Sequence, residues 1–247
     1  MHRFFVEPGQ IQGNICKITG DDAWHIQKVL RLGIDEEIIL CDSQGMDYIA
    51  VIQFVDKSLI QVKIVSQAPS KAEPKIEVSL LQALPKSSKM ETIIQKCVEL
   101  GIYEILPITT MRTVVRISDD RDARKKVQRW QKVAEEAAKQ SKRGIIPHIY
   151  EPIGIQQAVN ECNADLKLLF WEEEKEQSLH SLLHSQVFAP KSTAMLVGPE
   201  GGLDNSESEL AKQHGWVSVS LGSRILRTET AGMAALAAIM YHWREWE

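Results

Sequence analysis

The chain has 247 residues and a formal net charge of −4, with 44% hydrophobic and 25% charged residues. This length fits one large domain or two smaller ones, and the composition is typical of a globular protein with a substantial core. The first eight residues carry no long apolar run, and the longest apolar helical stretch, 231–240, is about half of a membrane span. We therefore expect a cytoplasmic protein without a signal peptide or membrane segment.

The four cysteines lie at isolated positions, without a CxxC pair or a neighbouring histidine cluster. Isolated cysteines are typical of reduced thiols in a core rather than of a zinc site or a disulfide framework. The sequence therefore predicts no metal. The four positions are Cys16, Cys41, Cys97 and Cys162.

Residues 1–70 carry short runs rich in β-branched residues, at 38–40, 48–52 and 59–65, with turn formers between them. Short strands at regular spacing predict a small antiparallel barrel. One helix, 22–32, interrupts the strands and ends at Gly33. The polar, proline-flanked stretch from residue 69 to residue 74 is typical of a linker, so we expect one domain over 1–70 and a second over 74–247.

From residue 74 onward, strands and helices alternate, which predicts a parallel α/β sheet with helices on both faces. The first helix follows a capping-box pattern at 88–91 and ends at Gly101. Its apolar face comprises Met90, Ile93, Ile94, Cys97 and Val98. The expected strands are 76–82, 102–108, 166–171, 193–197 and 216–221, and the later helices are 121–142, 206–214 and 229–243.

Positive charge is concentrated between residues 112 and 143, where eleven Lys and Arg outnumber five Asp and Glu. Such a block inside an acidic chain is typical of a surface that contacts phosphates. It is equally typical of the solvated face of a helix. The charge pattern alone leaves both interpretations open.

Two loops each follow an apolar strand and precede a helix, the place where open α/β sheets bind ligands. The first loop, GPEGG at 198–202, has three glycines that permit positive φ or close approach to a ligand. It matches neither the phosphate loop of nucleotide sites nor the glycine pattern of dinucleotide sites. Taken alone, it could equally be a structural turn.

The second loop, LGSRILR at 221–227, enters a helix at Thr228. Thr228 can cap that helix, and Glu229 suits its positive end. Arg227 lies at the junction of strand, loop and helix. There it could hold a phosphate or a base edge, or it could pair with Glu229 or Glu200 and brace the loop.

Together these stretches resemble the SPOUT methyltransferases, and more closely the 16S ribosomal RNA uridine-N3 methyltransferases of the RsmE type. The resemblance spans nearly the whole chain in order. Its motifs are MHRFF at 1–5, HIQKVLR at 25–31, KCVELG at 96–101, QSKR at 140–143, LVGPEGG at 196–202 and LGSRILRTETA at 221–231. One departure is Lys139, where many relatives carry an acid, and this departure affects the details of RNA contact.

The resemblance implies an α/β fold in which residues 74–247 form a trefoil-knotted SPOUT methyltransferase domain. Residues 1–70 would form a PUA-like, RNA-binding β-barrel. It also implies a homodimer with the cofactor site near the partner subunit, and the apolar C-terminal helix suits either a dimer face or an ordinary core. The implied reaction is S-adenosylmethionine-dependent methylation of uridine N3 at position 1498 of 16S rRNA in the small ribosomal subunit.

We expect backbone groups near the two loops to hold S-adenosyl-L-methionine. The expected cofactor residues are Phe170, Gly198, Gly202, Leu221, Gly222, Ile225 and Leu226. Arg227 would stabilise the anionic uracil or its phosphate, and Glu200 and Glu229 are candidate proton acceptors. For Glu229, helix capping is the favoured alternative.

RNA contacts are expected from three places: the N-terminal strand, the helix at 22–32, whose cations are spaced i, i+3 and i+6, and the basic block. The residues are Arg3, His25, Lys28, Arg31, Arg112 and Arg143. Two other functions remain open. One is a knotted methyltransferase that acts on tRNA or a ribose hydroxyl, and the other is a non-enzymatic RNA-binding assembly factor.

Overall fold

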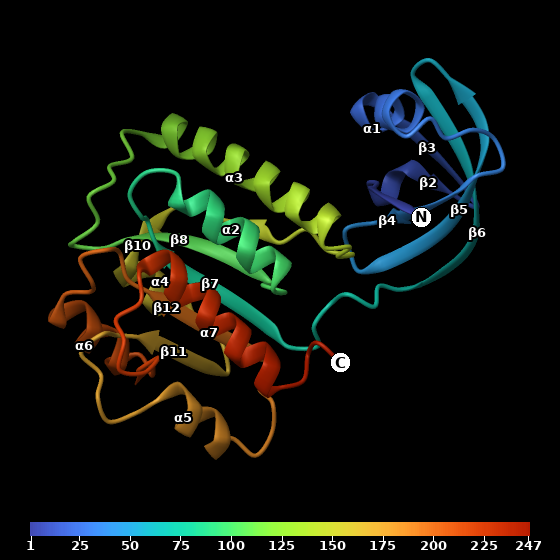
Figure 1. The fold of residues 1–247 in the computed structure, drawn as a ribbon. Coiled ribbons are helices and arrows are strands. Elements are labelled where there is room, and N and C mark those ends of the chain that lie inside the picture. Colours follow the sequence, from blue (N-terminus) through green and yellow to red (C-terminus); the bar gives the residue numbers. More distant parts are fainter. The chain divides into compact units, whose positions relative to one another are not determined.

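The computed structural model describes residues 1–247, which form two compact units. The N-terminal unit comprises Met1–Glu73 with Ala138–Ile146, and the C-terminal unit comprises Pro74–Ala137 with Pro147–Glu247. Figure 1 traces the elements of each unit. No helix of the chain combines the length and the apolar character that crossing a membrane requires.

The N-terminal unit is built on a six-stranded sheet with the order β1-β4-β5-β6-β3-β2. Its strands are β1 (His2–Phe5), β2 (Ile11–Gln12), β3 (Ile15–Thr19), β4 (Glu37–Cys41), β5 (Met46–Asp56) and β6 (Leu59–Pro69), with the short 3-10 helix η1 at Pro8–Gln10. Alternate side chains such as Ile38 and Leu40 enter one core, because successive strand residues point to opposite faces. The strands predicted at 38–40, 48–52 and 59–65 are confirmed, whereas β1 to β3 were not predicted.

The helix predicted over 22–32 is wrong in form. Helix α1 (Gly20–Trp24) continues directly into a π-helical turn, η2 (His25–Val29), and Arg31 follows in the left-handed region with φ 56°. Leu30 and Leu32 both pack on the core, and residues two apart on a regular helix cannot share one face. The expected i, i+3, i+6 stripe on a single helix therefore does not exist.

The C-terminal unit contains a parallel sheet, as predicted, with the order β10-β8-β7-β12-β11-β13 and with β9 beside β8. Its strands are β7 (Glu77–Ala83), β8 (Glu104–Thr109), β9 (His148–Ile149), β10 (Ile153–Gly154), β11 (Leu166–Phe170), β12 (Ser192–Val197) and β13 (Val217–Val219). The carboxyl ends of parallel neighbours lie at the same edge of a sheet, so the loops that leave β11, β12 and β13 meet there.

Helices cover both faces of this sheet, which confirms the predicted layering (Figure 1). The helices are α2 (Lys89–Glu99), α3 (Asp120–Gln140), α4 (Ile155–Glu161), α5 (Leu179–Ser185), α6 (Asn205–Gln213) and α7 (Thr228–His242). Residues of α4 and α6 share a core cluster with Leu81 and Leu196 on one face. On the other face Gly232 of α7 lies directly over Leu80 and Gln82, where a Cβ would lie 3.5 Å from Gln82 Oε1.

Helix α2 has the predicted apolar face but not the predicted cap. The five residues expected on that face are the five that are buried, and Gly101 follows with φ 100°. Ser88 forms no side-chain cap. The Glu91 carboxylate pairs instead with Arg129 of α3, with a distance of 2.7 Å between Oε1 and Nε. The short helices α4 and α5 were not predicted.

Candidate functional site

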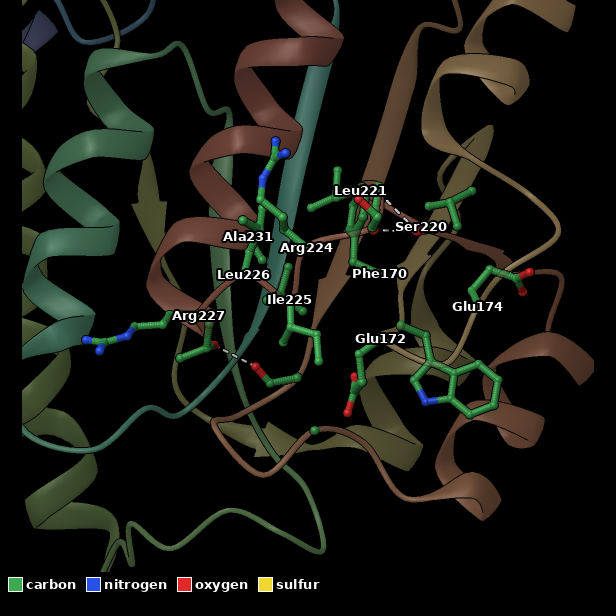
Figure 2. Close-up of a pocket in the computed structure, with 18 of the residues that line it drawn as sticks. Phe170, Glu172, Glu174, Ser220, Leu221, Arg224, Ile225, Leu226, Arg227 and Ala231 are labelled. Carbon is green, nitrogen blue, oxygen red and sulfur yellow. Dashed lines mark hydrogen bonds between the residues drawn. The ribbon is translucent and has the colours of Figure 1, made fainter.

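A cavity of about 1030 Å³ opens at the sheet edge where β11, β12 and β13 end. Three loops, at 171–178, 198–202 and 220–227, supply most of its walls. Figure 2 shows side chains from these loops gathered around one space. The volume suits a small-molecule ligand, since such sites span roughly 300–1,000 Å³.

The cavity combines an apolar wall with an anionic wall. Phe170, Leu221 and Leu226 form part of the apolar side, and Glu172 and Glu174 bring carboxylates to the other. Backbone amides two and three positions further along the chain donate to Glu174 and hold its pKa below the ordinary value, despite partial burial. Glu174 therefore stays ionised at neutral pH, and an apolar wall opposite a wall of carboxyl groups suits a ligand with an apolar body and a positive centre.

The residues predicted to hold the cofactor come from three separate stretches, and the fold brings all of them to this cavity. Its lining includes Phe170, Gly198, Gly202, Leu221, Gly222, Ile225 and Leu226. Glu200 and Arg227 also line it, whereas Glu229 lies in the first turn of α7 just beyond. The assigned roles of these residues stay predictions.

The first loop is packed tightly around two of its glycines. Gly202 has φ 70°, and a Cβ there would collide with the carboxylate of Glu172. At Gly198 a Cβ would lie 3.1 Å from Leu203 Cγ and 3.3 Å from the carbonyl carbon of Gly202. The Gly202 amide donates to the Pro199 carbonyl at 3.0 Å and closes a turn. The backbone can approach a ligand closely here, because no side chain intervenes.

Arg112 fastens this loop from the segment that follows β8. Its guanidinium donates to the Gly201 carbonyl at 3.1 Å and to Asp204 Oδ2 at 3.2 Å. Its side chain remains 45% exposed at the outside of the loop, so RNA contact by Arg112 stays a prediction beside this bracing role. The sequence signals only that this residue is basic and not which partner it takes.

Lys89, which sequence reasoning missed, joins the two candidate carboxylates. Its Nζ lies 3.0 Å from Glu200 Oε1 and 3.1 Å from Glu229 Oε2, and hydrogen bonds to these carboxylates raise its pKa. Burial acts to raise the pKa of Glu200 and Glu229, but hydrogen bonding and the Lys89 charge outweigh it and leave both lowered. Both carboxylates are therefore ionised and weakly basic at neutral pH.

Arg227 is exposed and makes no ion pair or side-chain hydrogen bond, and in Figure 2 it extends away from Glu172. The alternative ion pair of Arg227 with Glu200 or Glu229 is not formed, because Lys89 pairs with both carboxylates. Arg227 acts on Glu229 only through its charge, which helps to lower the pKa of that carboxyl. The predicted Thr228 cap is also wrong. Arg227 is the N-cap residue of α7, and the Thr228 hydroxyl donates to the Gly198 carbonyl at 2.6 Å.

Two predicted RNA ligands of the N-terminal unit are held in internal ion pairs. Arg3 donates to both Asp47 oxygens at 2.9 and 2.8 Å, and the side chain of Arg143, only 4% exposed, pairs with Glu73 at 2.6 Å. These contacts hold both guanidinium groups inside the unit, which does not support phosphate binding by either. The other predicted RNA ligands of this unit, His25, Lys28 and Arg31, are exposed.

Comparisons with known proteins agree with this architecture. An RNA methyltransferase domain model matches residues 72–240, and an RNA methyltransferase PUA domain model matches residues 18–65. Ribosomal RNA small subunit methyltransferase E of Bacillus subtilis (strain 168) is 36% identical, covering 98% of this chain and 96% of its own.

Solved structures give the same result. A ribosomal RNA small subunit methyltransferase E from Neisseria gonorrhoeae, bound to S-adenosylmethionine, has a TM-score of 0.86 and 30% identity, with 98% of each chain covered. A methyltransferase from Legionella pneumophila, also solved with S-adenosylmethionine, has a TM-score of 0.84 and 32% identity, covering 97% of this chain and 96% of its own.

Fold, cavity and matched domain models define the class of protein: a PUA domain joined to an RNA methyltransferase domain. The identity to the Bacillus relative extends along nearly the whole of both chains. The chain belongs to the ribosomal RNA small subunit methyltransferase E family. The resemblance predicted from the two loops is thereby confirmed.

Proposed function

We propose that this protein methylates N3 of uridine 1498 of 16S rRNA in the small ribosomal subunit, with S-adenosylmethionine as methyl donor. The observation that carries the proposal is the convergence of the two glycine loops and Phe170 on one cavity. Its support from relatives is that three proteins named ribosomal RNA small subunit methyltransferase E each match 96–98% of this chain.

The cavity fits the proposed cofactor on chemical grounds. Phe170, Leu221 and Leu226 offer apolar surface for an adenosyl group, and the glycines let backbone groups approach its polar edges. The carboxylates of Glu172 and Glu174 carry the charge opposite to a sulfonium. When bound, S-adenosylmethionine would supply an electrophilic methyl group.

Uridine N3 is a good nucleophile only after it loses its proton. Arg227, exposed and without a partner at the cavity edge, is placed to stabilise the resulting negative charge on the base or a neighbouring phosphate. Glu200 and Glu229 are the candidate proton acceptors, but Lys89 lowers the basicity of both. A Glu200→Gln variant separates the two roles: loss of kcat indicates proton acceptance, and unchanged kcat indicates loop bracing.

RNA contact is proposed for exposed cations on each unit. Lys28 and Arg31 provide them on the N-terminal unit, with the exposed His25 as a further polar contact. Helix α3 provides four more, at Arg121, Arg124, Lys125 and Lys132. If about six phosphates are neutralised, log affinity falls with log salt concentration at a slope of about −5. A flat response to salt would contradict this part of the proposal.

Three structural proposals accompany the function. Residues 1–70 form a PUA-like barrel, residues 74–247 form a trefoil-knotted domain, and two copies form a homodimer. The proposal of the knot rests on the family resemblance, and the 85% exposure of Ile225 beside the cavity supports a partner there. Light scattering on the purified protein tests the dimer.

The decisive experiment is mass spectrometry of 16S rRNA fragments after small subunits are incubated with the protein and S-adenosylmethionine. We expect one added methyl on the fragment that contains uridine 1498, and none with the Arg227→Ala variant. A methyl elsewhere would indicate another RNA target. Absence of calorimetric binding at millimolar cofactor would favour an assembly factor.

A further inference from the structure

A buried chain of hydrogen bonds connects the sheet to both loops of the cavity. Gln82, near the end of β7 and fully buried, donates from Nε2 to Thr228 Oγ1 at 2.9 Å. The Thr228 hydroxyl, also buried, donates to the Gly198 carbonyl at 2.6 Å. One hydroxyl therefore joins the first residue of the first loop to the residue at which the second loop enters α7.

The direction of this chain is fixed by its ends. The Gly198 carbonyl can only accept a hydrogen bond, so the Thr228 hydroxyl donates its single proton to that carbonyl. The hydroxyl oxygen must then accept from Gln82. The Gln82 amide nitrogen has a second acceptor, the Ala83 carbonyl at 3.0 Å, so a reversed amide would place its oxygen against two acceptors. Each amide proton of Gln82 and the hydroxyl proton of Thr228 therefore has one acceptor in this series of hydrogen bonds.

Neither Gln82 nor Thr228 belongs to the loops whose glycines were predicted to hold the cofactor. Gln82 lies opposite Val197 in the pairing of β7 with β12, and Val197 directly precedes Gly198. Thr228 follows Arg227 and precedes Glu229. A buried rigid strand therefore fixes the orientation of the Gly198 peptide and the start of α7 at the same time.

We infer that Thr228 is a positioning residue for the methyl-transfer site, and that Gln82 acts through it. The inference rests on the proposed function, because the loops that Thr228 positions form the wall of the proposed cofactor cavity. Thr228 sets the geometry of the first loop relative to Arg227. It need not contact the cofactor or the RNA for this role.

The test compares two buried threonines. Thr228→Val replaces the linking hydroxyl with a methyl group and leaves the Gly198 carbonyl without its partner. Thr193→Val is the matched control, because Thr193 is fully buried in β12 of the same sheet and its hydroxyl has no hydrogen-bond partner. Thr228→Ser restores the hydroxyl.

We expect Thr228→Val to weaken calorimetric binding of S-adenosylmethionine by about tenfold, because it removes both buried hydrogen bonds of the linking hydroxyl. Thr193→Val and Thr228→Ser should bind within about twofold of the unaltered protein. In the cofactor-free protein, amide hydrogen exchange of residues 200–204 should accelerate in Thr228→Val only. Equal binding and equal exchange in the two valine variants would overturn the inference.

A double variant tests whether Gln82 acts through Thr228. Gln82→Leu combined with Thr228→Val should bind the cofactor no more weakly than Thr228→Val alone, because both changes break one chain. Additive losses would overturn the role of Gln82. Failure of the unaltered protein to bind S-adenosylmethionine at all would instead refute the proposed function, so the two failures are distinguishable.

Discussion

The two loops of the cavity are held by different means. The loop at 198–204 is fastened by side chains from three other segments: Arg112 at Gly201, Lys89 at Glu200 and Thr228 at Gly198. In the loop at 221–227, hydrogen bonds outside the first turn of α7 join only Gly222 to the adjacent Ser220. The side chains of this loop at 223–225 are exposed.

This difference suggests a division of labour within the proposed site. A loop whose polar groups are already satisfied by the protein is preorganised, so it presents its remaining backbone groups to a ligand without reorganisation. A loop with unpaired cations keeps those cations available for charge brought by the substrate. We therefore expect changes in the first loop to affect cofactor binding, and changes in the second to affect methyl transfer.

The largest expected effect is in the second loop. Arg227→Ala should lower kcat for methyl transfer by about 10²–10³-fold, the usual consequence of removing one charge-stabilising donor, with cofactor affinity nearly unchanged. Arg224→Ala is the matched control, since Arg224 is also exposed and unpaired three residues away. Single-turnover methylation of small subunits measures the first quantity, and calorimetry measures the second.

Equal loss of cofactor binding and methyl transfer in Arg227→Ala would show that Arg227 supports the cavity itself. The same loss in Arg224→Ala would show that any unpaired cation of this loop serves. Either result would remove the division of labour between the loops.

The next effect is in the first loop. Gly202→Ala should weaken cofactor binding by about tenfold, because φ 70° is unfavourable by roughly 1–2 kcal/mol for a residue with a Cβ. The new methyl would also push the Glu172 carboxylate aside. Gly215 is the control position, because it has a similar φ of 79° but lies outside the cavity. Gly215→Ala should destabilise the protein without changing the cofactor affinity of the folded state.

Thermal melting separates the two glycine variants from a general loss of stability. If Gly215→Ala weakens cofactor binding as much as Gly202→Ala, the effect reports overall stability. The claim that the first loop is a preformed binding surface would then fail.

The sequence predicted those parts of the fold and site that depend on local pattern. The parallel sheet, the buried face of α2 and the convergence of the two loops all follow from periodicity and from the position of loops at strand ends. The two loops were recognisable because their glycines, which permit positive φ and close backbone approach, can be identified from a few consecutive residues. Their family membership followed from several motifs in order.

Pairings between distant side chains were not predictable. The charge of Arg112, Arg3 and Arg143 suggested RNA, yet each has a carboxylate partner 44 to 92 residues away in sequence. Lys89 followed a serine that looked like a cap, and its true partners lie on other elements. A single sequence gives the charge of a side chain but not its neighbour in space.

A smaller effect should come from Arg112. Arg112→Gln removes the hydrogen bonds to Gly201 and Asp204 and should weaken cofactor binding about threefold, since a partly exposed contact of this kind contributes little. Arg121→Gln is the control, because Arg121 is exposed on α3 and makes no contact with the loop. Calorimetry measures the affinity for the cofactor and reports on bracing of the loop. RNA affinity measured at two salt concentrations reports on phosphate binding.

If Arg112 contacts RNA instead, Arg112→Gln should leave cofactor affinity unchanged and reduce the salt slope of RNA binding by about one. That outcome would return Arg112 to the role that the sequence suggested. It would also show that the first loop keeps its conformation without the hydrogen bonds from Arg112 to Gly201 and Asp204.

The smallest effect is the pH dependence of the Lys89 bridge. The pKa values of Glu200 and Glu229 lie below their ordinary 4.5, so the bridge is complete above that value and is lost as pH falls through the lowered pKa. The pKa of Lys89 lies above its ordinary 10.5, so the bridge is also lost as pH rises through that raised value. Between about pH 5 and 10 the bridge should therefore contribute a constant amount.

Cofactor affinity measured from pH 8 down to pH 4 checks this expectation. The unaltered protein should show a flat profile to about pH 5 and then a decline of no more than about fivefold, and Lys89→Gln should lose most of the decline. Lys96→Gln, which removes an ion pair with Glu99 on the same helix but outside the cavity, should keep it. A decline that begins near neutral pH in the unaltered protein would identify a different titrating group, and the bracing of the first loop by Lys89 would lose its support.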